Sequence, residues 1–252
     1  MIRKLLSKPR TTTPTEFRWR SSEVSRLEEL SDAVIGFALT LLVVSLEVPQ
    51  TFDELLQTIR GFPAFGLCFA LLIVIWYEHY TFFRRYGLQD TTTIVWNTVF
   101  LFLIVFYVYP LKFLFTLFSN EALGMSMQVT SSGGDIVPMI EQGQLSQLYL
   151  IYGIGWSAVW LVFVLLYRHA LKHAEHLKLN PLEVFDTQAS IGENVAAVCV
   201  GLASIALTFL GATGVAGWVY LVMFPLTWVI KRRNALRRHT LETRLTPVSE
   251  QE

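Results

Sequence analysis

Charged residues are scarce in this chain. Only 16% of its 252 residues are Asp, Glu, Lys or Arg, whereas 53% are hydrophobic. A soluble domain of this size usually carries about a quarter charged residues. The deficit predicts that much of the surface faces lipid rather than water. The formal net charge is zero, so the overall charge does not indicate nucleic acid or any other highly charged partner.

Cysteines and catalytic motifs are equally sparse. The two cysteines, Cys68 and Cys199, both lie inside apolar runs, so the sequence predicts neither a disulfide framework nor a metal site. It contains no Walker loop, complete dinucleotide fingerprint, nucleophile elbow or His-Glu-x-x-His motif. We therefore expect a protein that is not an enzyme and has no cofactor. No signal peptide is expected, because the first thirty residues are polar and basic and the first apolar run lacks a small-residue cleavage site.

Long apolar runs are what the sequence has in abundance. A membrane-spanning helix takes about 20 mostly apolar residues, and six stretches meet or approach this length: residues 30–49, 55–83, 93–118, 145–167, 189–210 and 215–230. All are too long for the strands of a transmembrane barrel, which alternate over roughly ten residues. We expect the second stretch to run through Pro63 as one helix, and Pro110 to kink the third.

The sequence thus predicts an all-α, polytopic membrane protein with six transmembrane helices. Its single membrane domain covers residues 22–239. Polar tails precede it at 1–21 and follow it at 240–252, and we expect both tails to be disordered or to lie on the surface.

The basic residues lie almost entirely on one side of these spans. Of the 20 Lys and Arg residues, 18 flank the spans on the side of the two termini, and only Arg60 and Lys112 fall near the other side. The positive-inside rule therefore places both termini in the cytoplasm. The longest outer connection, residues 119–144, has no Lys or Arg but carries Glu121, Asp135 and Glu141. An acidic outer mouth would favour cations, and an ordinary solvated loop explains these residues equally well.

Three groups of polar residues lie in or beside the predicted spans, where charges are costly and often functional. The first span begins with Arg26-Leu-Glu-Glu-Leu-Ser31-Asp32, the second ends with Trp76-Tyr-Glu-His79, and the third contains Asn97. The simplest interpretation of the first group is that Ser31 caps the helix and Asp32 favours its positive end. A buried Asn usually finds a partner on another helix.

Several short stretches in and after the first predicted span form a pattern: Arg26, Leu30-Ser31-Asp32-Ala33-Val34, Thr40-Leu41-Leu42-Val43 and Val48-Pro49. The pattern resembles the first-helix signature of the transmembrane protein 175 family of potassium channels, which reads Arg-x-x-x-Phe-Ser-Asp followed by an apolar run ending near a Pro. Trp76-x-x-His79 and Asn97 match the family's second and third helices, so the detailed likeness covers about residues 26–115. Leu30 replaces the Phe of the motif, and Tyr80 stands where the family often has a second His.

The resemblance implies a prokaryotic homotetramer of six-helix subunits in the inner membrane that conducts potassium with modest selectivity. The expected partners are further copies of the chain, membrane lipid, K⁺ and other monovalent cations. The family has no carbonyl filter loop, and this sequence likewise contains no Thr-Val-Gly-Tyr-Gly stretch. In the family, apolar side chains of the first helix form the pore constriction. The matching positions are Phe37, Leu41 and Val44, and Thr40 matches the position implicated in ion selection.

Helix geometry allows this assignment. At 100° per residue, the three constriction residues lie within about 60° of one another, and Asp32 lies about 140° from Phe37. We therefore expect the stripe to face a shared axis while Asp32 faces its own bundle. The structural polar network expected there consists of Arg26, Ser31, Asp32, Trp76, His79 and Asn97. An apolar stripe on a membrane helix more often faces lipid or the core, so the pore assignment rests on the resemblance.

Two alternatives stay open. A secondary or proton-coupled cation transporter would have broken helices and an ionisable residue at the midplane. Pro63 and Pro110 are possible breaks, but no charged residue lies clearly at a midplane.

The second alternative is a metal site just past the fourth span, where an i, i+4, i+7 pattern places His169, His173 and His176 on one helix face. Three imidazoles on one face can bind a transition metal, although such a run is more often a solvated helix end.

Overall fold

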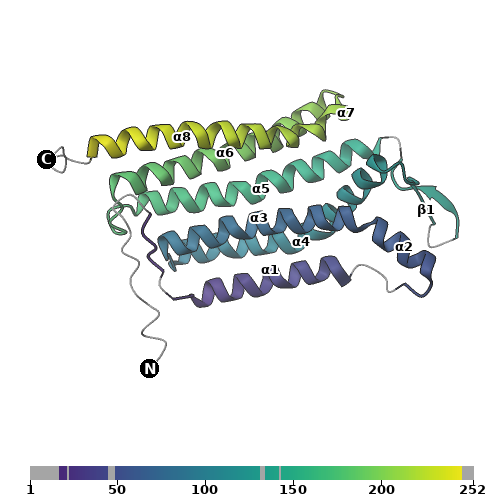
Figure 1. Ribbon diagram of the computed structural model, residues 1–252, viewed down its shortest axis with the longest axis horizontal. Coiled ribbons are helices and arrows are strands. Elements are labelled where there is room, and N and C mark those ends of the chain that lie inside the picture. Colours follow the sequence, from purple (N-terminus) through teal and green to yellow (C-terminus); the bar gives the residue numbers. More distant parts are fainter. Residues whose placement is uncertain (1–16, 22, 45–48, 131–133, 142, 246–252) are drawn as a thin grey trace.

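The computed structural model describes residues 17–21, 23–44, 49–130, 134–141 and 143–245, and its long helices lie side by side as an elongated bundle (Figure 1). These helices are α1 (Arg26–Val44), α3 (Phe62–Tyr86), α4 (Thr91–Ala122), α5 (Gln144–Lys172), α6 (Pro181–Phe209) and α8 (Met223–Leu245). Helix α1 begins and α8 ends at the same end of the bundle, and α2 (Phe52–Arg60) lies at the other end (Figure 1). The mainly helical fold agrees with the prediction.

Five helical segments in the described part of the chain are long and apolar enough to cross a membrane. They comprise residues 62–86, 91–121, 144–172, 181–209 and 213–245. Helix α1 is not one of the five, because Glu28, Glu29 and Asp32 lie in its first two turns, although it is about as apolar on average as α3. Its 19 residues correspond to a length of about 28 Å at 1.5 Å per residue. That length is close to the ~30 Å hydrocarbon core of a bilayer.

The predicted second span is two helices rather than one. Helix α2 ends at Arg60, and α3 begins at Phe62 with Pro63 in its first turn. Proline fits there because the first N–H groups of a helix have no intrahelical partner. The expectation that one helix continues through Pro63 is therefore wrong. Pro110, by contrast, does lie inside α4.

The connections at the end of the bundle opposite the start of α1 contain further short elements. The loop after α4 contains strands β1 (Gln128–Thr130) and β2 (Ile136–Pro138), which pair antiparallel with Val129 opposite Val137. The predicted sixth span begins irregularly, with α7 (Thr213–Ala216) and the 3₁₀ turn η2 (Trp218–Val222) before α8. Helix α8 then continues to Leu245, so the start of the predicted C-terminal tail is helical.

Helices α5 and α6 approach each other closely at two glycines. A Cβ atom on Gly153 would collide with the side chain of Ile205, and one on Gly201 would collide with the hydroxyl of Ser157. Small residues allow such close approach of helices in membranes, where packing rather than hydrophobicity drives association. Helices α4 and α7 pack on α5, and α7 and α8 pack on α6, so the α5–α6 pair connects these parts of the bundle.

The residues that precede α1 are tied to the opposite side of the bundle. Arg20 donates hydrogen bonds to the Glu183 carboxylate (2.6 Å) and to the Leu177 carbonyl (2.8 Å). Glu183 also accepts from the backbone N–H groups of Arg18 (2.9 Å) and Asn180 (3.0 Å). Asn180 and Glu183 together cap the start of α6. The last residues of the predicted N-terminal tail are therefore held against the turn between α5 and α6.

Asp90 joins the start of α4 to the end of α5. Its carboxylate accepts hydrogen bonds from the Thr92 amide (3.1 Å) and the Thr93 hydroxyl (2.6 Å), and His169 Nε2 lies 2.9 Å away. Burial alone raises the pKa of Asp90, but these bonds outweigh it and lower the pKa to about 2. The stability that the carboxylate contributes is therefore complete above pH ~4 and is lost only as the pH falls through about 2.

The three histidines at and after the end of the fourth span have different contacts. His169 contacts Asp90, and His173 Nδ1 lies 3.0 Å from the His169 carbonyl oxygen. The side chain of His176 is exposed. Across the described ranges, no group of three His, Cys, Asp or Glu residues has a metal-binding arrangement.

We expect Glu183→Gln to destabilise the protein. The Arg20 side chain is only 15% exposed, so it would lose its charged partner in a largely desolvated position. Breaking such a pair costs about 3 kcal/mol, or roughly a 10 °C fall in the thermal unfolding midpoint. Glu175→Gln, which changes an exposed carboxylate in the same turn, is the matched control. Equal midpoints for the two variants would show that the Arg20–Glu183 contact is not stabilising.

Candidate functional site

Helix α1 starts earlier than predicted. Ser25 and Glu28 form the capping pair: the Glu28 N–H donates to Ser25 Oγ (3.2 Å), and the Ser25 N–H donates to a Glu28 carboxylate oxygen (2.8 Å). This arrangement places Ser31 in the second turn. Capping by Ser31, the simplest interpretation of the sequence, is therefore wrong.

Ser31 instead takes part in a buried chain of hydrogen bonds between three helices. The Asn97 amide of α4 donates to Ser31 Oγ (2.9 Å), and Ser31 donates to the Leu27 carbonyl (2.7 Å). His79 Nε2 of α3 donates to the Asn97 amide oxygen, 2.8 Å away. All three polar side chains are at most 1% exposed. We call Ser31, His79 and Asn97 the buried triad.

Aromatic side chains hold the imidazole of the buried triad in place. The ring of His79 stacks on Phe100 with centroids 5.1 Å apart, and Phe83 lies 4.6 Å away on α3. Both phenyl rings are fully buried. The polar chain is thus enclosed by apolar side chains, so its members have no water to replace a lost partner.

Asp32 and Arg26 do not lie where the sequence analysis places them. Asp32 is exposed, at the edge of α1, where it accepts a hydrogen bond from Trp76 Nε1 (2.8 Å). Arg26 is exposed, and it lies about 140° around the helix from Ser31 at 100° per residue. The structure therefore joins three of the six expected network residues, Ser31, His79 and Asn97. Asp32 and Trp76 pair with each other instead, and Arg26 lies apart.

Helix α1 has one packed face and one open face. Ile35, Ala38 and Leu42 are at most 3% exposed and pack on α3 and α4. On the other side, Phe37 is 56% exposed. Thr40 is also exposed, and its hydroxyl donates to the Gly36 carbonyl (2.9 Å).

The three residues expected at the constriction are not equivalent in the structure. Phe37 lies on the open face, whereas Leu41 lies at its border and packs partly against the core. The side chain of Val44, at the end of α1, lies outside the described part of the chain.

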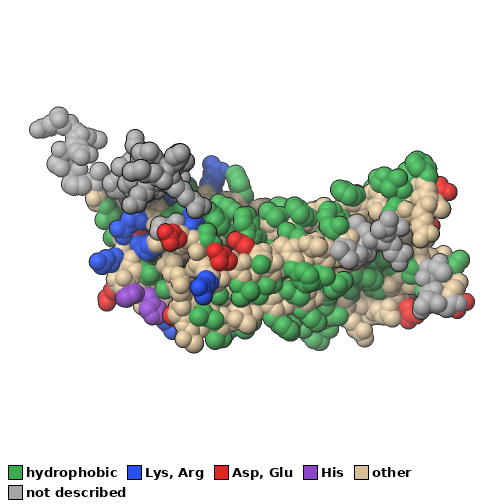
Figure 2. All heavy atoms as spheres, turned by 90° about the horizontal axis from the view of Figure 1, so that it is seen from below, with side chains coloured by type: hydrophobic (Ala, Val, Ile, Leu, Met, Phe, Trp, Pro, Cys, Tyr) green, Lys and Arg blue, Asp and Glu red, His purple; other side chains and the backbone are tan. Residues whose placement is uncertain are grey.

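The wider surface has the charge pattern of a membrane protein. On the face shown in Figure 2, Lys, Arg and His side chains gather at the end where α1 begins, and hydrophobic side chains cover the middle. Acidic side chains reappear at the far end. Glu121 in the last turn of α4 and Asp135 and Glu141 in the loop that follows are all exposed. This distribution, with the five apolar helices, defines a multi-pass membrane protein.

Comparison with known proteins identifies the family. Residues 26–107 match the sequence profile of the endosomal/lysosomal potassium channel TMEM175. A potassium channel from Marivirga tractuosa is 39% identical over 222 residues, which cover 86% of this chain and 90% of the relative. The potassium channel Cha6605_3372 from Chamaesiphon minutus is 33% identical over 97 residues, which cover 35% of this chain and 48% of the relative. The chain therefore belongs to the TMEM175 family of potassium channels.

Solved structures agree with this assignment. A crystal structure of the potassium channel MtTMEM175, a threonine-to-alanine variant in complex with a nanobody–MBP fusion protein, is 38% identical. It superimposes with a TM-score of 0.75 and covers 88% of this chain and 98% of its own. The lysosomal potassium-selective channel TMEM175 homolog from Chamaesiphon minutus shares the fold at 24% identity, with a TM-score of 0.54 over 83% of this chain and 96% of its own.

Asn97→Ala should loosen α1 from the bundle. The substitution leaves the His79 N–H without its acceptor and Ser31 without its donor, in a site where these groups are at most 1% exposed. An unsatisfied buried group costs about 1–3 kcal/mol, so we expect the unfolding midpoint of the purified protein to fall by several degrees. Thr98→Ala, which removes an exposed hydroxyl one residue away, should change it little. Equal effects of the two variants would contradict the role of the buried triad.

Proposed function

We propose that this protein is a potassium-preferring cation channel, in which α1 of several copies surrounds the conduction path. One observation carries the proposal: α1 is fixed to α3 and α4 through buried polar and apolar contacts on one side, while Phe37 and Thr40 on its other side are exposed. A helix held rigidly by one face can present its opposite face to an axis with little cost in side-chain ordering.

The proposed pore needs more than one chain. A single α1 covers only one side of a channel, and its open face has no partner within the described part of the chain. Four copies, as the family resemblance implies, would bring four Phe37 side chains toward a common axis. The solved relative with 38% identity is a potassium channel, which supports extending the function to this chain. In this assembly α1 would cross the membrane as the first span of each subunit and bring the number of spans to six.

The proposed gate is a ring of apolar side chains. Phe37 is the bulkiest residue of the proposed gate. Leu41 lies at the border of the open face, and Val44 lies about one turn beyond Leu41 along α1. A narrow apolar ring loses its water and stops ions, and a wider ring admits hydrated cations. Such a pore needs no loop of backbone carbonyls. We further propose that Thr40, beside Phe37 on the open face, contributes to ion selection through its hydroxyl.

Charge supports a cation path and a defined orientation. The exposed Glu121, Asp135 and Glu141 lie at the end of α4 and in the loop that follows, whose described part has no Lys or Arg, and a negative potential there raises the local cation concentration. The basic end of the bundle would face the cytoplasm by the positive-inside rule. We therefore propose an inner-membrane protein with both termini in the cytoplasm.

Flux measurements on purified protein in liposomes test the proposal against a coupled transporter. A channel gives passive K⁺ current that follows the electrochemical gradient, resolves into single-channel steps and needs no second ion. Transport that requires a proton or sodium gradient at a fixed stoichiometry would contradict the channel and favour the transporter.

Phe37→Asn should increase the conductance of the closed or narrow state, because a polar ring retains water where the phenyl ring excludes it. We expect smaller changes for Leu41→Asn and Val44→Asn, measured as single-channel current and K⁺/Na⁺ permeability ratio in planar bilayers. Val43→Asn is the matched control, because Val43 is 49% exposed on the same helix but points about 120° away from Phe37. Unchanged currents in all three variants would contradict the assignment of the constriction to this face of α1.

Thr40→Ala should lower the K⁺/Na⁺ permeability ratio without lowering thermal stability, since the hydroxyl is exposed and bonds only within α1. Thr98→Ala removes an equivalent exposed hydroxyl that bonds within α4, and it should leave the ratio unchanged. Reversal potentials under bi-ionic conditions measure the K⁺/Na⁺ permeability ratio. The same ratio in wild type and Thr40→Ala would exclude Thr40 from ion selection.

A further inference from the structure

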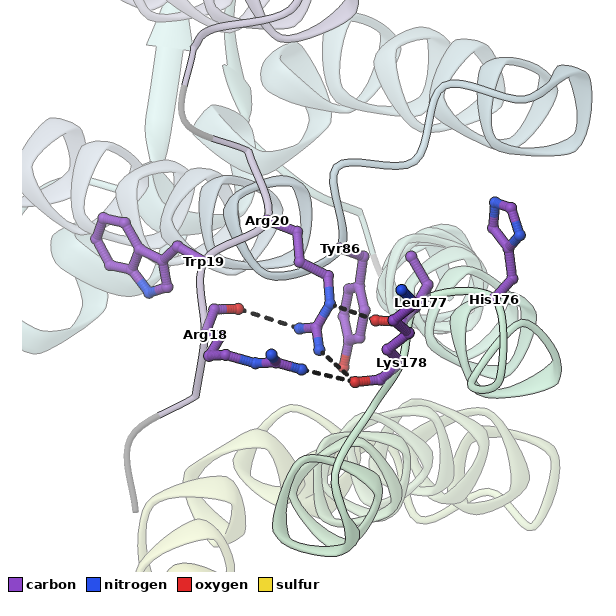
Figure 3. A pocket seen from close by; sticks show the side chains of 7 residues that line it. All are labelled: Arg18, Trp19, Arg20, Tyr86, His176, Leu177 and Lys178. Atoms are coloured by element: carbon purple, nitrogen blue, oxygen red, sulfur yellow. Dashed lines mark hydrogen bonds between the residues drawn. The ribbon is translucent and has the colours of Figure 1, made fainter. Parts of the chain in front are cut away.

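The described chain has a cavity of about 390 Å³ at the end of the bundle where α1 begins. Figure 3 shows its lining, which comes from three separate parts of the fold. The lining residues are Arg18, Trp19 and Arg20 before α1, Tyr86 at the end of α3, and His176, Leu177 and Lys178 in the turn between α5 and α6. None of them belongs to the proposed conduction path.

Positive charge exceeds negative charge in this cavity. Arg18, Arg20 and Lys178 line it, and no carboxylate does. Glu183 lies behind the lining, is 1% exposed and is bound by Arg20 at 2.6 Å. Arg18 Nε is 3.6 Å from Glu183, and the Arg18 side chain is 52% exposed. The one carboxylate that contacts the lining is thus shared by two guanidinium groups, and the lining as a whole carries an excess of positive charge.

Hydrogen bonds to backbone carbonyls hold the two guanidinium groups in place. Arg18 Nη2 donates to the Lys178 carbonyl (2.7 Å), and Arg20 Nε donates to the Leu177 carbonyl (2.8 Å). These bonds appear as dashed lines in Figure 3. The Arg20 backbone N–H also donates to the Arg84 carbonyl (3.1 Å). An anion that enters the cavity therefore meets guanidinium groups that are already ordered, which lowers the entropic cost of binding.

The residues at the rim of the cavity indicate the level of the bilayer at which the cavity lies. Trp19 is 53% exposed, and the guanidinium of Arg84 lies 5.2 Å from its ring centroid. Exposed tryptophans with neighbouring arginines are typical of the headgroup level of a bilayer. Basic pockets between helices at that level bind the phosphate groups of lipids.

We propose that this cavity binds a phosphate-bearing anion, either the phosphodiester of an anionic phospholipid or a soluble phosphate. Arg18 and Lys178 are the residues whose charge would contact the phosphate, and Arg20 with Glu183 keeps the walls together. The site is separate from ion conduction, and it stands whether or not the proposed pore is correct.

The test measures the thermal midpoint of the full-length protein in detergent with three additives: dioleoylphosphatidylglycerol, dioleoylphosphatidylcholine and inorganic phosphate. We expect phosphatidylglycerol to raise the midpoint and phosphatidylcholine not to. Removing one cation with Arg18→Gln or Lys178→Gln should increase the half-maximal lipid concentration about fivefold, the effect of one basic residue at an anionic surface. Lys172→Gln, an exposed cation on α5 outside the cavity, should respond like wild type.

The outcomes separate the two sources of phosphate. A shift with phosphatidylglycerol alone identifies the lipid, and an equal shift with inorganic phosphate identifies a soluble ligand. If neither probe shifts the midpoint, or if the shift persists unchanged in both cavity variants, the proposal is wrong. An increase in the half-maximal lipid concentration that is as large for Lys172→Gln as for Lys178→Gln would also overturn the proposal, because such a result would indicate unspecific attraction between the lipid and the basic surface. Midpoints without additive show whether each variant is folded, and Lys178→Gln keeps the test valid if Arg18→Gln is unstable.

Discussion

The hydrogen bonds of Asn97 decide where α1 sits. Its amide group binds Ser31 on one side and His79 on the other, and all three side chains are enclosed by apolar residues. Rotating α1 by one residue would remove Ser31 from its donor and leave an amide unpaired, at a cost of about 1–3 kcal/mol. This penalty selects one rotation of α1. In that rotation the small and aliphatic face lies against α3 and α4, and Phe37 faces outward.

Much of the fold could be predicted, because apolar runs of membrane length have few structural alternatives. The errors arise where local chemistry decides a boundary. Pro63 looked internal to one span, yet it starts a helix, as proline does in a first turn. The fifth span begins at Pro181 rather than near residue 189, and Asn-Pro-x-Glu at residues 180–183 is a readable capping signal. The β1–β2 hairpin depends on pairing between short segments that show no strong strand pattern.

Part of the polar network was predicted from the sequence, but its geometry was not. The sequence placed Ser31, His79 and Asn97 in one network, but spacing alone assigned the inward role to Asp32, which is exposed beside Trp76. The direction of a side chain depends on the rotation of the whole helix, and tertiary contacts fix that rotation. The Arg20–Glu183 contact joins residues 163 positions apart. No periodic pattern reports such a pairing, although the capping motif that contains Glu183 shows that its carboxylate is structurally engaged.

The central claim is that Phe37, on the open face of α1, lines the ion path. The most direct test places one cysteine at that position, as Phe37→Cys, in a chain whose Cys68 and Cys199 are replaced by Ser. A charged, water-soluble thiol reagent is then applied during K⁺ current recording, with Val43→Cys in the same background as the comparison. The account predicts that modification blocks most of the current through the Phe37→Cys channel and leaves the Val43→Cys channel unaffected. Undiminished current after complete modification at position 37 would contradict it.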